Sequence, residues 1–227
     1  MQRSFRAGAK EVAPLLVGVV PFALVAGSAV TDVGLGILEA AACSIIVFAG
    51  AAQLALTQLW GDGAPLLVVI ATALVVNARF VMYSASLAPV ISPEAGRARP
   101  FLGYLLTDQV YAVTVLKGRE NGSRPVPYYL GAGLALWFTW QVGTIAGAML
   151  GAVIPASWQL DFAVPLVFLV LLVPALKVRA DVEVAIVSGL AAAALVPVLP
   201  LQSGLLVAIL CGAAWGAWRA IGEDDHA

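Results

Sequence analysis

Long apolar stretches alternate with short polar loops along the chain, and this pattern predicts a polytopic membrane protein. A helix needs about 20 apolar residues to cross about 30 Å of hydrocarbon. Stretches near that length lie at residues 12–30, 37–59, 64–87, 101–116, 127–151, 158–176, 183–199 and 203–220. The short loops leave no room for a soluble domain, so we expect an all-α fold and a single transmembrane domain over residues 1–227.

Composition agrees with this prediction and excludes several classes of function. The chain is 62% hydrophobic and 11% charged, whereas soluble domains are about 25% charged. Its formal net charge of −1 gives no basic surface for nucleic acid. The sequence contains no nucleotide-binding glycine loop with a lysine, no histidine-rich metal helix and no intramembrane protease arrangement. We therefore expect no catalysis, no cofactor and no metal.

Small residues inside the apolar stretches indicate close helix packing. Glycines recur every four residues at Gly143, Gly147 and Gly151, and again at Gly212 and Gly216. This spacing lets the backbones of two helices approach closely.

The basic residues test how many of the stretches cross the membrane, because such residues prefer short cytoplasmic loops. If all eight stretches cross from a cytoplasmic N-terminus, Arg97 and Arg99 lie outside. The conflict disappears if 37–59 and 101–116 each enter and leave on the same face, because every basic residue except Arg79 then lies inside. Six stretches would then span fully, and two would be re-entrant or broken helices.

Two details favour this second arrangement. Residues 37–59 carry the run Ala49-Gly50-Ala51-Ala52 beside Gln53, and the short stretch 101–116 holds Asp108 at its middle. Non-helical backbone at membrane depth is tolerated where it lines a cavity, and broken helices commonly form transporter binding sites. Eight full spans remain the alternative. Both arrangements place both termini on the cytoplasmic side of a bacterial inner membrane.

Three polar groups interrupt the apolar stretches and are the candidate functional residues: Arg79 with Asn77, Asp108 with Thr107 and Gln109, and Gln53 with Thr57. A charge near the centre of a membrane helix costs roughly 2.5–3.5 kcal/mol on insertion scales, and such residues usually face a partner or a substrate. Helical spacing places Tyr83 near Arg79, and it places Tyr104 and Tyr111 on the side of Asp108.

Two accounts of the charges stay open at this point. In the structural account, Arg79 and Asp108 form an ion pair that holds two segments together. In the functional account, Arg79 binds a substrate carboxylate through its planar guanidinium, and Asp108 receives a substrate ammonium or a coupling proton. Both accounts hold together if the substrate competes for the pair.

Two further carboxylates begin apolar stretches, Glu39 and Asp161, and Asp32 lies in the loop before the first of them. Carboxylates suit helix N-termini, which explains them structurally. A gating or ion-coupling role is the alternative, and we retain Glu39 with Asp108 as the coupling candidates.

At these same residues the chain resembles the large subunit of the branched-chain amino acid exporters, the azaleucine-resistance permease family of AzlC type. The matching stretches are Phe48-Ala49-Gly50-Ala51-Ala52-Gln53, Asn77-Ala78-Arg79 with Tyr83 and Ser86-Leu87, Thr107-Asp108, Trp140 with Gly143-Thr144 and Gly147, and Leu160-Asp161-Phe162-Ala163 with Pro165. They follow one another in order along nearly the whole chain.

This resemblance implies export of branched-chain or similar amino acids, together with a small hydrophobic second subunit of AzlD type with about four spans. It directs attention to Arg79, Asp108, Asn77, Gln53, Tyr83 and Gly50 as substrate-binding residues. Two positions depart from the family pattern: Phe80 stands where the family has a histidine, and Gln109 where it often has glutamate. A proton-coupling role at those two positions is therefore not expected here.

The residues themselves fit a zwitterion with a branched side chain, which needs a cation, an acceptor and an apolar pocket. Arg79 supplies the cation and Asp108 the acceptor. The small-residue run beside Gln53 supplies the apolar pocket. Two other classes remain open: a channel or carrier for another small solute, and a membrane scaffold whose charges only hold the fold together.

Overall fold

The computed structural model describes residues 2–117, 124–151, 176, 178–199 and 203–224. Within these residues every regular element is a helix, which confirms the all-α fold. Three of the described helices are long and apolar enough to cross a membrane, Gln2–Asp32, Leu66–Ile91 and Pro125–Gly151. The stretch predicted at 158–176, with Asp161, lies almost entirely outside the described residues. The number of spans therefore stays a prediction.

The chain forms two compact units, Met1–Val167 and Phe168–Ala227, and each is described by itself. A single domain over residues 1–227 stays a prediction.

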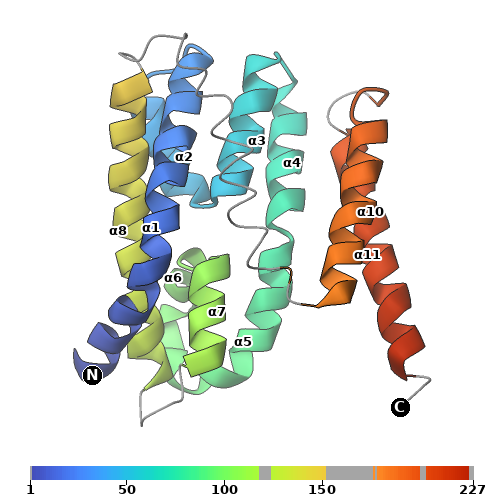
Figure 1. The fold of residues 1–227 in the computed structure, drawn as a ribbon. Coiled ribbons are helices and arrows are strands. Elements are labelled where there is room, and N and C mark those ends of the chain that lie inside the picture. The colour runs from blue at the N-terminus through green and yellow to red at the C-terminus, as the bar shows by residue number, and fades with distance from the viewer. Residues whose placement is uncertain (1, 118–123, 152–175, 177, 200–202, 225–227) are drawn as a thin grey trace. The chain divides into compact units, whose positions relative to one another are not determined.

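The first unit is built on two long helices that lie side by side and run in the same direction, α1 (Gln2–Asp32) and α8 (Pro125–Gly151) (Figure 1). Glycines on both helices allow the contact. A Cβ atom on Gly27 would overlap the Thr144 carbonyl oxygen, and one on Gly147 would overlap the Leu24 carbonyl oxygen. The predicted packing role of Gly147 is thereby confirmed, since no side chain fits between these backbones.

Residues 37–59 form a hairpin of two short helices, α2 (Ile37–Val47) and α3 (Gly50–Gly61). Between them Phe48 adopts the left-handed conformation (φ 38°) and Ala49 is extended, so the helix cannot continue. Gly61, the last residue of α3, packs against Val33, which lies shortly before the start of α2. The break falls beside the predicted small-residue run, and the hairpin enters and leaves at the same end of the unit.

The following helices cross the unit in the opposite direction. α4 (Leu66–Asn77) and α5 (Arg79–Ala95) form one long helix with a bend at Ala78. The short 3₁₀ helix η1 (Gly96–Ala98) then leads into a second hairpin, formed by α6 (Arg99–Tyr104) and α7 (Asp108–Lys117).

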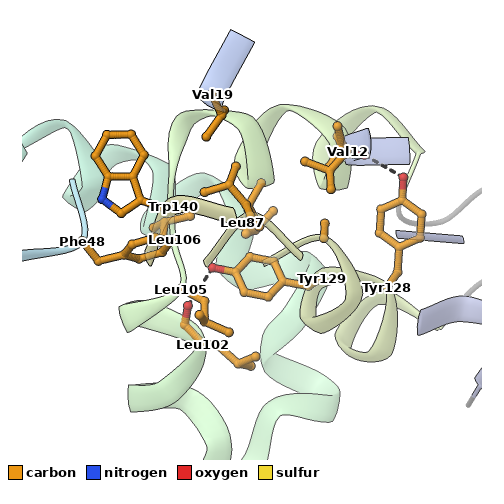
Figure 2. Close-up of a cluster of buried hydrophobic side chains, with 14 of the residues drawn as sticks. Val12, Val19, Phe48, Leu87, Leu102, Leu105, Leu106, Tyr128, Tyr129 and Trp140 are labelled. Carbon is orange, nitrogen blue, oxygen red and sulfur yellow. Dashed lines mark hydrogen bonds between the residues drawn. The ribbon is translucent and has the colours of Figure 1, made fainter. Parts of the chain in front are cut away.

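The second hairpin also returns to the end from which it came. The Tyr129 hydroxyl at the start of α8 donates to the Leu102 carbonyl of α6 (2.6 Å), and the Tyr128 hydroxyl donates to the Val113 carbonyl of α7 (3.5 Å). Both arms of this hairpin therefore lie along the first turns of α8. Figure 2 shows the Tyr129 ring within the buried core that joins these elements.

One end of the first unit collects its basic residues. The Arg124 amide donates to the Ser4 hydroxyl (3.0 Å), and the Arg124 guanidinium pairs with Glu94 (3.5 Å). The N-terminus, the end of α5 and the start of α8 thus meet there. Arg97 lies in η1, which directly follows α5, and Arg99 begins α6. This is the distribution expected when 37–59 and 101–116 are re-entrant.

The second unit contains a pair of helices, α10 (Arg179–Leu195) and α11 (Ser203–Asp224). Glu183 of α10 joins them, because it pairs with Arg219 of α11 (2.8 Å) and accepts a hydrogen bond from the Trp215 indole (3.4 Å). Gly212 packs against Ser188, where a Cβ would overlap the Ser188 hydroxyl.

The α1–α8 contact gives a first prediction. Gly147→Ala should lower the stability of the protein by about 1–3 kcal/mol, because the added methyl must displace backbone rather than a flexible side chain. Gly18→Ala is the matched control, since Gly18 lies on α1 with open space around its Cα. Thermal unfolding of the purified protein in detergent measures both variants. Equal melting temperatures for the two would contradict the close backbone contact.

Candidate functional site

Three interruptions of helix geometry meet at the middle of the first unit (Figure 1). They lie at Phe48–Ala49, at Ala78 and at Leu105–Thr107, and the helices α3, α5 and α7 each begin directly after one of them. The first residues of these three helices are Gly50, Arg79 and Asp108, all of them candidate residues from the sequence. Helix N-termini carry unpaired N–H groups and a positive partial charge, which favour anionic groups.

Arg79 and Asp108 form an ion pair across two of these breaks. Arg79 Nη2 lies 3.1 Å from Asp108 Oδ2. The side chains remain 34% and 43% exposed, so the pair is not sealed inside the core of the first unit. The ion pair of the structural account is therefore present.

Hydroxyl groups surround the Asp108 side of the pair. The Tyr83 hydroxyl hydrogen-bonds the Asp108 carboxylate, and the Tyr83 ring stacks on Tyr111 with centroids 4.4 Å apart. The Tyr111 hydroxyl in turn lies 3.0 Å from the Ser86 hydroxyl. Tyr83 and Tyr111 thus take the places that helical spacing predicted for them.

The Arg79 side of the pair has unused hydrogen-bonding capacity. Arg79 Nε and Asn77 Oδ1 are both buried without a hydrogen-bond partner among the described residues. The guanidinium carbon lies 5.2 Å from the centroid of the Phe80 ring, a cation–π contact. Buried polar atoms without partners are uncommon, and at a ligand site they are the atoms that a ligand can satisfy.

Gln53 and Gly50 lie on the first hairpin, against the long helices. Gln53 is fully buried and accepts a hydrogen bond from the Trp140 indole (3.4 Å), whereas its Nε2 has no partner among the described residues. A Cβ on Gly50 would lie 2.6 Å from the Trp140 ring and 2.5 Å from Phe22. Gly50 is therefore required for close packing of the broken segment. In the same helix, the Gln53 Nε2 amide has no hydrogen-bond acceptor among the described residues.

The prediction that Tyr104 lies on the side of Asp108 was wrong. A continuous helix over 101–116 would put it on the side of Asp108, but the helix ends at Tyr104 and restarts at Asp108. Its hydroxyl instead donates to the Ile45 carbonyl at the end of α2 (2.7 Å) and accepts from the Trp137 indole (2.8 Å). Tyr104 therefore joins the second hairpin to the broken end of the first.

A second group at the end of α2 went unnoticed in the sequence. The Gln141 amide donates to the Ser44 carbonyl (3.3 Å), and the Ser44 hydroxyl donates to Thr144 (3.5 Å). All three residues are buried. The signal that could have found them was the presence of three uncharged polar residues within apolar stretches.

Glu39 lies at the start of α2, and the structure shows its structural role. Its carboxylate accepts the Gly36 N–H (2.9 Å), and the side chain is exposed. This is the helix-start role that the sequence suggested for it. A coupling role for Glu39 stays a prediction.

The comparisons with known proteins agree with the resemblance. A family model described as AzlC protein matches residues 14–154. The chain is 28% identical over 218 residues to the inner membrane protein YgaZ of Escherichia coli strain K12, covering 92% of this chain and 88% of that protein. It is 32% identical over 219 residues to a membrane protein of Archaeoglobus fulgidus, covering 94% of each. No solved structure matches the chain.

The candidate site residues Gly50, Gln53, Asn77, Arg79 and Asp108 fall within the matched region, whereas the resembling stretch at 160–165 lies beyond it. That region covers more than half of the chain, and the archaeal relative covers nearly all of it. The chain therefore belongs to the AzlC protein family, a family of membrane proteins.

Proposed function

We propose that this chain is a subunit of a secondary transporter that exports branched-chain or similar neutral amino acids. The observation that carries the proposal is the Arg79–Asp108 ion pair, which lies partly exposed where three helix breaks meet. Broken helices at membrane depth are typical of transporter binding sites. A free amino acid carries both charges that such a pair can receive.

The ion pair suits a zwitterion because both of its charges have a partner with and without bound substrate. When the site is empty, the two charges neutralise each other. When substrate binds, Arg79 takes the carboxylate and Asp108 takes the ammonium, so neither charge is left unpaired. Asn77 and Gln53 offer one acceptor and one donor that have no partner among the described residues.

The apolar surroundings suit a neutral side chain. Leu54, Phe80 and Tyr83 pack on the same hydrophobic core as the buried Phe48. A second charge on the substrate would be costly there without a partner. We therefore assign valine, leucine, isoleucine and similar free amino acids as the substrate class.

Transport requires a driving force, and we assign an ion gradient. The sequence contains no nucleotide-binding motif. Asp108 is the coupling residue that we favour over Glu39, because it touches the substrate-binding Arg79 whereas Glu39 binds the start of its own helix. The alternatives are a channel or a carrier for another small solute, and a scaffold in which the ion pair only holds α5 and α7 together.

We further propose six full spans with two re-entrant hairpins, with the basic end of the first unit and both termini in the cytoplasm. The location is the cytoplasmic membrane, and the Escherichia coli relative is named an inner membrane protein. A small hydrophobic second subunit of AzlD type completes the transporter in this proposal.

Topology gives the second prediction. Single cysteines placed near Gly61 and near Arg97, in a background without Cys43 and Cys211, should react with an impermeant thiol reagent from opposite faces. The first should react from outside and the second from inside, because the two hairpins open toward opposite ends. Labelling of position 97 from outside would favour eight full spans.

The ion pair gives the third prediction. Arg79→Lys should reduce transport strongly although the charge is kept, because a compact ammonium cannot make the bidentate contact with a carboxylate. Asp108→Asn should abolish transport or change its pH dependence. Efflux from cells with equal membrane abundance of each variant measures both. The matched controls are Arg97→Lys and Asp62→Asn, which change exposed residues outside the site.

A paired substitution separates the carrier from the scaffold. Arg79→Leu with Asp108→Leu removes both charges and leaves none unpaired. The carrier should still fold but lose transport. Normal efflux in the paired variant would refute the proposed site and favour a purely structural role for the ion pair.

The fourth prediction tests the substrate. Cells that lack their own exporters and are loaded with valine- or leucine-containing dipeptides should release the free amino acid faster when this chain and its small partner are expressed together. Release should slow when the proton gradient collapses, and either subunit alone should give little. If the pair moves another solute and leaves valine, leucine, isoleucine and methionine efflux unchanged, the amino acid assignment fails.

A further inference from the structure

A pocket of about 410 Å³ lies at the basic end of the first unit, away from the Arg79–Asp108 pair. The first turns of α1 and α8 and the end of α5 form its walls. Arg6, Glu94 and Arg124 contribute charged groups, and Phe5, Val126 and Leu130 contribute apolar surface. The proposed transport site uses none of these residues.

Among the described residues that line this pocket, arginines outnumber carboxylates. Two arginines, Arg6 and Arg124, line it together with one carboxylate, Glu94. The contact between Arg124 Nε and Glu94 Oε1 is long, at 3.5 Å, and the Arg124 side chain is 57% exposed. The Arg124 backbone is held in place by its hydrogen bond to Ser4. A positioned guanidinium with a weak partner is suited to bind an anion.

The lengths and charge patterns of α1 and α8 indicate that the pocket lies at the depth of the lipid headgroups. α1 has 31 residues, which makes it about 46 Å long, whereas the hydrocarbon layer is about 30 Å thick. Residues 12–31 of this helix carry no charge and fill the hydrocarbon, so Arg6 falls below its edge. α8 likewise has no charged residue after Arg124, which places that residue at the same boundary.

We propose that this pocket binds an anionic phospholipid, with the phosphate between Arg6 and Arg124 and one acyl chain along Phe5, Val126 and Leu130. Basic pockets between membrane helices on the cytoplasmic side are suited to such headgroups. The apolar wall distinguishes the ligand from free phosphate, which has no group to place there. Glu94 neutralises Arg124 in the empty pocket and competes with the lipid for it.

The test uses the purified full-length chain with phosphatidylglycerol or phosphatidylcholine added to the detergent. Phosphatidylglycerol should raise the melting temperature by about 2–4 °C more than phosphatidylcholine, and should remain bound in native mass spectrometry. Arg6→Gln with Arg124→Gln should weaken phosphatidylglycerol binding at least about tenfold, because each basic residue near the surface contributes to attraction of anionic lipid. The matched control is Arg3→Gln with Arg97→Gln, which removes two exposed arginines outside the pocket and should keep the lipid preference.

Glu94→Gln tests the same site in the opposite direction. It removes the competing carboxylate and should tighten phosphatidylglycerol binding, so the proposal stays testable even if the double arginine variant does not fold. Equal effects of the two lipids would overturn the proposal, as would an equal loss in the control variant. A full effect of glycerol 3-phosphate or inorganic phosphate would also overturn it, because these anions lack the acyl chain.

Discussion

The structure depends on satisfying the backbone where helices stop inside an apolar bundle. The hydrocarbon layer offers no water to unpaired carbonyl groups, so a broken helix needs partners from its own protein. At the end of α2 the Ile45 carbonyl accepts the Tyr104 hydroxyl, and the Ser44 carbonyl accepts both the Phe48 N–H and the Gln141 amide. The glycine contacts of α1 and α8 hold the frame on which the hairpins rest. These partners stabilise the break between α2 and α3.

The same breaks bring the charged residues together. Arg79 follows the bend at Ala78 and Asp108 begins α7 directly after the break at Leu105–Thr107, and their side chains meet at 3.1 Å. Continuous helices would have placed these residues within regular hydrogen-bonded turns. The interruptions that cost backbone hydrogen bonds thus also form the place where the proposed transporter would bind its polar ligand.

The sequence predicted the parts of this arrangement that are local, and missed those that depend on contacts between segments. The small-residue run beside Gln53 and the position of Asp108 marked two of the three breaks, and the distribution of Arg97 and Arg99 agreed with them. The bend at Ala78 was missed, because the apolar pattern continues through it. Tyr104 was misplaced because helical spacing was applied across a break. No local pattern indicates that a tyrosine will cap the carbonyl of a helix 59 residues away.

The two hairpins of the first unit open toward opposite ends. The first hairpin opens toward the end where Val33 and Gly61 meet, and the second opens toward the basic end. Their tips contact each other through the ring pair of Phe48 and Tyr104, with centroids 5.7 Å apart. The breaks in the two hairpins are therefore packed against each other. They rest on α1 and α8, whose backbones lie so close that no side-chain atom can be added between them.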